Sequence, residues 1–300
     1  MTPRPPDFLI VGAAKCGTTA LHAYLRSHPR VAMAGRKEPR FWSSDLDRPG
    51  RVTEWAEYVA LWNGSDDGAL RGEASTNYIW SEVAIPAIVR SRADARLIAM
   101  VRNPIEMAHA LHSELVKTFQ DDVGSFERSW RLQEARRRGR RIPTECIDPR
   151  LLHYGRVCAL GDQLERFFEV VPEENRMVVV FDDVVADPSA VYLETLAFLG
   201  LADDGRTTFE RLNPNRNMRS ATLARVHRSL PRRFPRAYPS ARAVVTRVGV
   251  SPSAVVNRLN LWDGPRRPMR PEFRAELRDF FAPQIDRLAA LLGRDLSHWR

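Results

Sequence analysis

The segment of residues 7–26 constrains the fold more than any other part of the sequence. Residues 8–11 form an apolar run long enough for a buried strand. Residues 12–17 form a loop of mostly small side chains, and a helix is predicted after it, with Leu21 and Leu25 on one face. In such a unit the N–H groups of the loop and the positive end of the helix dipole both point at an anion. The segment therefore predicts a phosphate-binding loop at the end of a core strand.

The glycine spacing of this loop is close to that of a P-loop, but its lysine is displaced. Gly12 and Gly17 keep the G-x-x-x-x-G frame, whereas Thr18 stands where the P-loop lysine belongs and Lys15 lies inside the loop. An inside lysine can sit beside a phosphate bound directly in the loop. A P-loop kinase therefore fits less well. A glycine-containing turn with an incidental lysine is the simplest alternative.

Residues 15–19, Lys-Cys-Gly-Thr-Thr, resemble the 5'-phosphosulfate loop of sulfotransferases that use 3'-phosphoadenosine-5'-phosphosulfate (PAPS). Segments 25–29 and 37–41 are similar to the same family, and best match its branch of heparan sulfate and bacterial carbohydrate or small-molecule sulfotransferases. The resemblance implies that Lys15 contacts the bond between phosphate and sulfate. The residues that it implies for holding the 5'-phosphosulfate are Cys16, Gly17, Thr18 and Thr19.

Arg102 directly follows the apolar run 96–101, which predicts a second core strand. Ligands of open α/β sheets bind at the carboxyl edge of the strands, so an arginine there suits a second phosphate. The resemblance implies that Arg102 holds the 3'-phosphate of the nucleotide together with a serine eight residues later. Here Ala110 stands at the serine position and Met107 stands where many relatives have arginine. A structural arginine at a strand end is the alternative.

A loop before the last predicted helix loosely resembles the nucleotide loop of the same family. Gly264 and one of Arg266 or Arg267 are expected to close over the nucleotide, although Asp263 replaces the leading lysine of the family pattern. A basic loop without a ligand is an equal alternative.

Three residues are candidates for acceptor chemistry. Sulfuryl transfer to an alcohol needs a base for the acceptor proton, and the resemblance implies Glu38 for this role, with Arg40 at a position that is histidine in the family. A surface glutamate that pairs with its basic neighbours is the alternative. Glu73, at another predicted strand end, is expected to bind the acceptor, to assist as a second acid–base group or to pair with Lys15. His112 is an alternative base near the acceptor.

Strands alternating with helices predict an α/β fold, a three-layer P-loop-like fold with a central parallel sheet flanked by helices. We expect a single sulfotransferase domain over residues 1–300, with a disordered lead at 1–6 and an irregular acceptor-side segment at 203–270. The remaining strands are expected at 31–33, 69–75 and 177–181. The remaining helices are expected at 54–62, 81–92, 104–117, 126–139, 151–171 and 190–199 and from residue 271.

Composition limits the partners and the compartment. The formal net charge is +9, with 46 basic and 37 acidic residues, which fits a nucleic acid, an anionic membrane or an anionic small ligand. The basic run 136–141 is better explained as a solvated helix end, so no nucleic acid is expected. Three scattered cysteines and the absence of a long apolar stretch predict a cytoplasmic protein without a membrane span.

These observations predict an enzyme that transfers the sulfuryl group of PAPS to a hydroxyl of a glycan, lipid or small-molecule acceptor, with Lys15 and Glu38 as its catalytic residues. No metal is expected, because no metal-binding carboxylate pattern accompanies the loop. A non-catalytic nucleotide-binding relative is the alternative from another class, motivated by the departures from the family pattern at Ala110, Met107, Arg40 and Asn77. The sequence leaves the acceptor and the oligomeric state open.

Overall fold

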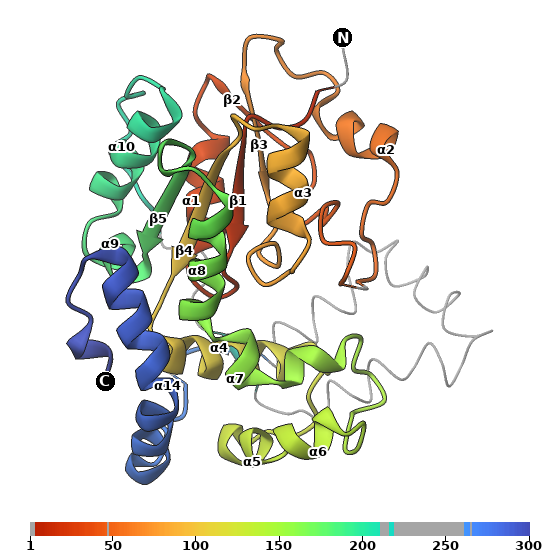
Figure 1. Ribbon diagram of the computed structural model, residues 1–300, viewed down its shortest axis with the longest axis vertical. Coiled ribbons are helices and arrows are strands. Elements are labelled where there is room, and N and C mark those ends of the chain that lie inside the picture. Colours follow the sequence, from red (N-terminus) through yellow and green to blue (C-terminus); the bar gives the residue numbers. More distant parts are fainter. Residues whose placement is uncertain (1–3, 47, 211–215, 219–260, 265) are drawn as a thin grey trace, which may run out of the picture.

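A five-stranded parallel sheet forms the centre of the molecule, in the order β2-β3-β1-β4-β5 (Figure 1). The computed structural model describes residues 4–46, 48–210, 216–218, 261–264 and 266–300. All five residues of β1 are buried, as expected for a strand covered on both faces. The strands are β1 (Phe8–Gly12), β2 (Val31–Met33), β3 (Leu70–Ala74), β4 (Arg96–Val101) and β5 (Arg176–Val180).

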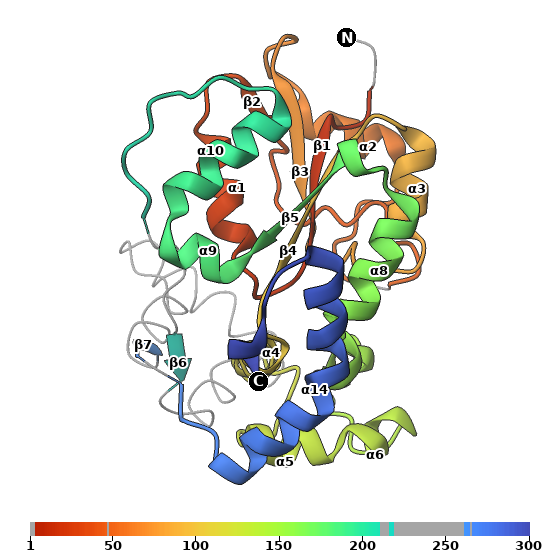
Figure 2. The ribbon, with the colours of Figure 1, turned by 60° about the vertical axis from the view of Figure 1, so that its left-hand side comes forward.

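Helices cover both faces of the sheet and confirm the predicted three-layer α/β fold. Figure 2 shows α1 (Thr18–Arg26) and α10 (Pro188–Leu199) on one side, and α3 (Ala84–Ser91) and α8 (Leu160–Val170) on the other. Because all strands of the five-stranded sheet run parallel, the segments that follow β1, β3 and β4 leave the same edge of this sheet. The candidate site lies at this edge.

Helix α4 (Pro104–Lys117) starts directly behind β4. Its start follows the expected chemistry, since Pro104 occupies the first turn and the side chain of Asn103 accepts a hydrogen bond of 2.9 Å from the N–H of Ile105. The long helix α14 (Pro271–Leu292) packs against α4 and α8. This packing places the loop before α14 near α4.

The prediction of two long helices between residues 126 and 171 was wrong. The first divides into α5 (Phe126–Arg131) and α6 (Gln133–Arg137), and α6 ends just before Gly139, whose φ is 73°. The second divides into the 3₁₀ turn η2 (Pro149–Leu152), α7 (Tyr154–Val157) and α8, because Ala159 adopts a non-helical ψ of 65°. Apolar spacing alone did not reveal these breaks.

Smaller differences concern element ends. Helix α3 begins at Ala84 and not at Ser81, because the Ser81 hydroxyl caps its start by accepting hydrogen bonds from the N–H groups of Val83 and Ala84. Phe181, predicted to end a strand, begins α9 instead. The remaining elements are α2 (Trp55–Val59), η1 (Ala60–Trp62), η3 (Glu173–Asn175), α9 (Phe181–Ala186), β6 (Arg216–Met218), β7 (Leu261–Asp263) and η4 (Ser297–Trp299).

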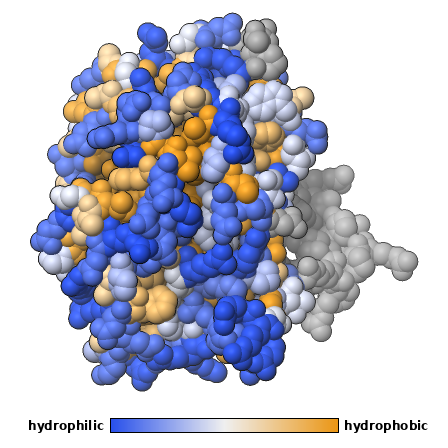
Figure 3. All heavy atoms as spheres, viewed as in Figure 1, coloured by the Kyte–Doolittle hydropathy of each residue, from blue (hydrophilic) through white to orange (hydrophobic). Residues whose placement is uncertain are grey.

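The segment expected to be irregular, residues 203–270, lies mostly outside the described residues. Its described parts contribute β6 and β7, which pair antiparallel. The face in Figure 3 is largely hydrophilic, with hydrophobic residues gathered in a band across its upper half. Among the described residues, no helix combines the length and apolar character that crossing a membrane requires.

Candidate active site

The loop between β1 and α1 has a backbone that only its glycines adopt without strain. Gly12 has a φ of 145° and Gly17 a φ of 92°. A Cβ atom on Gly17 would also come within 2.8 Å of Cδ2 of Phe181. Gly17 caps the start of α1, and Thr18 is the first residue of that helix and is buried. The loop therefore directs the N–H groups of the helix start toward one point, as an anion site requires.

Lys15 extends from this loop in a left-handed conformation, with a φ of 65°. Its Nζ atom lies 3.5 Å from Oε2 of Glu114 on α4. Burial lowers the pKa of Lys15, and the neighbouring Lys117 and Arg266 lower it further, while Glu114 opposes the shift. A half-buried ammonium with two cations nearby is a site that an anionic ligand would stabilise.

Arg102 lies beside this loop at the end of β4. Its Nη1 atom donates a hydrogen bond of 3.3 Å to the carbonyl oxygen of Lys15, and its guanidinium lies 4.5 Å from the centre of the Phe181 ring. Arg266, from the loop before α14, is half-buried, and its pKa is lowered by burial first and by Arg102 second. Lys15, Arg102 and Arg266 therefore influence one another and form a cationic group that suits two phosphate-type anions.

The other predicted binding residues of these loops differ in how far they are buried. Cys16 is fully buried, and burial raises the pKa of its thiol to about 12, so this side chain stays neutral. Gly264 is half-buried in the same loop as Arg266, whereas Arg267 is exposed. The structure therefore brings Arg266 into the electrostatic range of Lys15 and Arg102.

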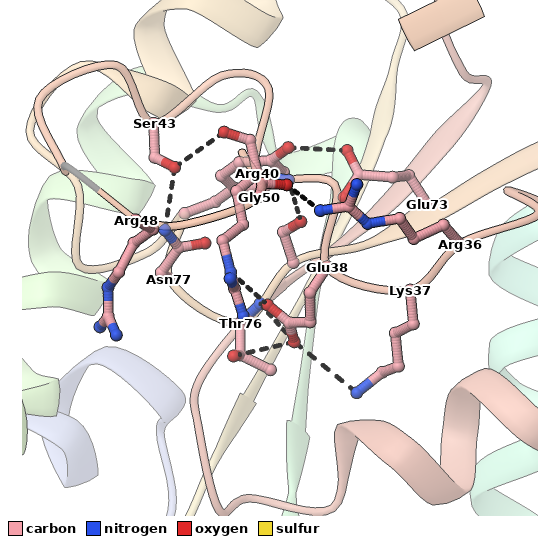
Figure 4. A network of polar contacts seen from close by, with 12 residues as sticks. Arg36, Lys37, Glu38, Arg40, Ser43, Arg48, Gly50, Glu73, Thr76 and Asn77 are labelled. Carbon is pink, nitrogen blue, oxygen red and sulfur yellow. Dashed lines mark hydrogen bonds and ion pairs between the residues drawn. The ribbon is translucent and has the colours of Figure 1, made fainter. Parts of the chain in front are cut away.

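Glu38 lies across from the loop, between two cations and a threonine (Figure 4). Its carboxylate oxygens are 3.7 Å from Nζ of Lys37 and 3.5 Å from Nε of Arg40. Oε1 accepts a hydrogen bond of 3.1 Å from the Thr76 hydroxyl, and both oxygens accept from the Thr76 N–H. The side chain is 21% exposed, so an acceptor hydroxyl can still reach it.

Lys37 connects the two halves of the site. Its Nζ atom donates a hydrogen bond of 3.1 Å to the hydroxyl of Thr19 in the first turn of α1 and also pairs with Glu38. The loop that carries both residues is held against the end of β3, since the N–H of Glu38 donates to the carbonyl of Ala74 and the N–H of Arg40 to the Ser75 hydroxyl. Glu38 and the anion loop are therefore joined through one ammonium group.

Glu73 is fully buried, and its carboxylate bonds to tyrosine hydroxyls, whereas Lys15 pairs with Glu114. Its Oε2 atom accepts hydrogen bonds from the hydroxyls of Tyr58 at 2.8 Å and Tyr78 at 2.9 Å. Burial raises the pKa of Glu73 to about 7, although the hydrogen bonds from the two tyrosines act to lower it. Trp42 donates from its indole N–H to the Tyr58 hydroxyl, so Glu73 anchors the loop that carries Glu38.

His112 is also enclosed by protein. It is 4% exposed, and its Nε2 atom is bonded at 2.8 Å to the carbonyl of Val123, while its ring packs against Phe126 and Tyr154. Burial lowers its pKa. The contacts therefore give His112 a packing role at the inner face of α4.

Sequence reasoning missed three participants, namely Lys37, Thr76 and Glu114. Lys37 stands beside Glu38 in the quoted motif, so its proximity was the available signal. Thr76 and Glu114 contact the site only through the pairing of distant segments, which the sequence does not display. Among the described residues, no group of three or more histidine, cysteine or carboxylate side chains could hold a metal ion.

The chain is similar to several known proteins. A family model described as the sulfotransferase domain matches residues 5–229. Heparan sulfate glucosamine 3-O-sulfotransferase 6 of Mus musculus is 29% identical over 209 residues, covering 66% of this chain and 53% of that protein. Carbohydrate sulfotransferase 15 of Homo sapiens is 24% identical over 338 residues, covering 98% of this chain and 54% of that protein. The chain thus spans about half the length of these relatives.

One solved structure resembles this chain over nearly its full length. The crystal structure of a sulfotransferase from Alicyclobacillus acidocaldarius superposes with a TM-score of 0.73 at 26% identity, covering 99% of each chain. This likeness extends beyond the family match, because it includes the C-terminal part of the chain that contains α14.

Proposed function

Because this chain belongs to the sulfotransferase family, we propose that it transfers the sulfuryl group of PAPS to a hydroxyl of a carbohydrate, lipid or small-molecule natural product. The observation that carries the proposal is the cationic group of Lys15, Arg102 and Arg266 at the carboxyl edge of the sheet, opposite a carboxylate. A nucleotide with phosphates at both its 3' and 5' positions would satisfy these cations. When bound, PAPS supplies an activated sulfuryl group on its 5'-phosphate.

The residues of this chain then have separable roles. Glu38 takes the proton of the acceptor hydroxyl as the acceptor oxygen forms its bond to sulfur. The bond between sulfur and the 5'-phosphate oxygen breaks in line, and its electron pair stays on that oxygen. Lys15 faces this oxygen and stabilises its developing charge, while Thr18, Thr19 and backbone N–H groups hold the phosphate.

Lys37 extends this proposal. Its ammonium group contacts both Thr19 and Glu38, the residues that flank the path of the transferred group. A cation there stabilises the charge on the sulfuryl oxygens during the transfer, when the sulfur atom is fully bonded to neither the donor oxygen nor the acceptor oxygen. Arg102 and Arg266 hold the 3'-phosphate. No serine hydroxyl assists them at position 110, because Ala110 stands there.

Calorimetric titration with 3',5'-adenosine diphosphate, the desulfated product, tests the nucleotide site. We expect micromolar binding by the wild type that is indifferent to magnesium and to EDTA. Lys15→Ala and Arg102→Ala should each weaken it at least tenfold, because each removes a charge-assisted phosphate contact. Binding of ATP in magnesium, without binding of the 3',5'-diphosphate, would contradict the proposal and support a P-loop kinase.

A non-catalytic nucleotide-binding protein is the second candidate, favoured by the buried Ala110 and Met107 where relatives have polar contacts. Tight binding of the 3',5'-diphosphate, without consumption of PAPS in the presence of any hydroxyl acceptor from a panel of sugars, phenols and lipids, would support it. Turnover that is lost in Glu38→Gln while nucleotide affinity is kept would support the transferase.

A further inference from the structure

Glu114 is a carboxylate inside the proposed anion site, which is an unusual place for a negative charge. It lies on α4, and its Oε2 atom is 3.5 Å from Nζ of Lys15 and 2.8 Å from Nζ of Lys117. Among the described neighbours of Lys15, it is the acidic group with the largest effect on the pKa of that lysine. The mechanism proposed above gives Glu114 no role.

The pair is partly buried, so its electrostatic interaction is not lost to solvent. The side chains of Lys15 and Glu114 are 32% and 38% exposed. Burial by itself would raise the pKa of Glu114, but Lys15 and Lys117 together bring it below its ordinary value. Glu114 is therefore ionised at neutral pH before a nucleotide enters.

We propose that Glu114 is a positioning residue that competes with the 5'-phosphate of the nucleotide for Lys15 and so promotes release of the desulfated product. This inference rests on the proposed function. Lys15 is paired with Glu114 when the nucleotide is absent, and it must exchange this partner for the phosphate when the nucleotide binds. The repulsion between Glu114 and the phosphate adds to the cost of binding.

Competition from Glu114 weakens binding of the desulfated product more than it weakens binding of the donor. In the donor, the oxygen that faces Lys15 bridges phosphorus and sulfur and carries little charge. After transfer this oxygen is terminal and the 5'-phosphate becomes a dianion. The negative charge next to Lys15 is therefore greater after the reaction than before it, so Glu114 lowers the affinity for the product more than the affinity for the donor.

The test is calorimetric titration of the full chain with 3',5'-adenosine diphosphate at low and at high ionic strength. We expect Glu114→Gln to bind it roughly fivefold more tightly than the wild type at low ionic strength, with a smaller gain at high ionic strength. Glu114→Asp, whose shorter carboxylate reaches Lys15 less well, should fall between the two. In the Lys15→Ala background, Glu114→Gln should give a smaller gain, because only the direct repulsion of the phosphate is then removed.

Glu165→Gln is the matched control. Glu165 lies on α8, and the substitution removes one negative charge from its exposed ion pair with Arg287 of α14. It should leave the affinity unchanged, which separates competition at Lys15 from a change in net charge. Equal or weaker binding by Glu114→Gln, with normal binding by the wild type, would overturn this inference and leave the proposed function intact. Absence of binding by the wild type would overturn both.

Discussion

At the scale of single residues, Glu73 gives the fold a specific pH dependence. Its carboxyl group is fully buried, and burial raises its pKa to about 7 from an ordinary value of 4.5. Between these two values the folded protein binds a proton that the unfolded chain releases. The contribution of Glu73 to the free energy of unfolding is therefore largest at low pH and decreases by about 3 kcal/mol as the pH rises to 7.

Glu73→Gln should remove this dependence. Urea unfolding at a series of pH values should show the stability difference between variant and wild type changing by roughly 2–3 kcal/mol between about pH 5 and pH 8, in favour of the variant at high pH. Glu82→Gln, at a side chain that is 69% exposed, is the control and should follow the wild type. A parallel course of the Glu73→Gln and wild-type curves would show that Glu73 is ionised throughout.

Residues of the site differ in how far the sequence could predict them. Lys15 and Arg102 could be predicted because each stands in a short local pattern, directly behind an apolar run that becomes a core strand. Glu114 could not, because it reaches Lys15 only once α4 has packed beside the anion loop. The fully buried position of Glu73 is likewise a product of the aromatic residues that surround it and not of its own neighbours in sequence.

At the scale of elements, a buried ion pair joins α6 to the segment that follows α4. The guanidinium of Arg136 donates hydrogen bonds of 2.7 and 3.0 Å to the two carboxylate oxygens of Asp121, and both side chains are 0% exposed. Ser129 and Tyr154 also donate to Asp121. The short helices α5 to α7 are thus held around one charged pair.

Removal of one partner should be costly, because it leaves the other charge buried alone. We expect Arg136→Ala to lower the free energy of unfolding by about 3–5 kcal/mol, measured by urea unfolding. Arg137→Ala, at the adjacent and exposed pair with Glu134, should leave stability unchanged. A small loss in Arg136→Ala would mean that solvent reaches Asp121 in the folded protein.

The same region shows why its elements were harder to predict than the sheet. Strands β1 and β4 are continuous apolar runs because both of their faces are covered, and such runs are visible in sequence. Arg136, by contrast, stands in a basic run that looked like a solvated helix end, and it is 1% exposed. Its burial depends on Asp121, which is distant in sequence.

At the scale of the whole molecule, the last residues of the chain contact the segments that carry Arg102 and Phe181. Trp299 is 2% exposed and belongs to the main hydrophobic core. Its carbonyl oxygen accepts a hydrogen bond of 3.0 Å from the side chain of Asn103, next to Arg102. Its indole N–H donates to Asp182, next to Phe181, whose ring faces the Arg102 guanidinium.

Trp299→Ala should therefore affect both stability and the nucleotide site. Loss of the buried indole should lower the free energy of unfolding by about 3–5 kcal/mol. Loss of the bond to Asp182 should let Phe181 and Arg102 shift, so calorimetry should show weaker binding of 3',5'-adenosine diphosphate at temperatures where the variant is folded. His298→Ala is the control, since its side chain is 57% exposed and pairs with the same Asp182. Unchanged nucleotide affinity in folded Trp299→Ala would show that Arg102 is positioned by β4 and the anion loop alone.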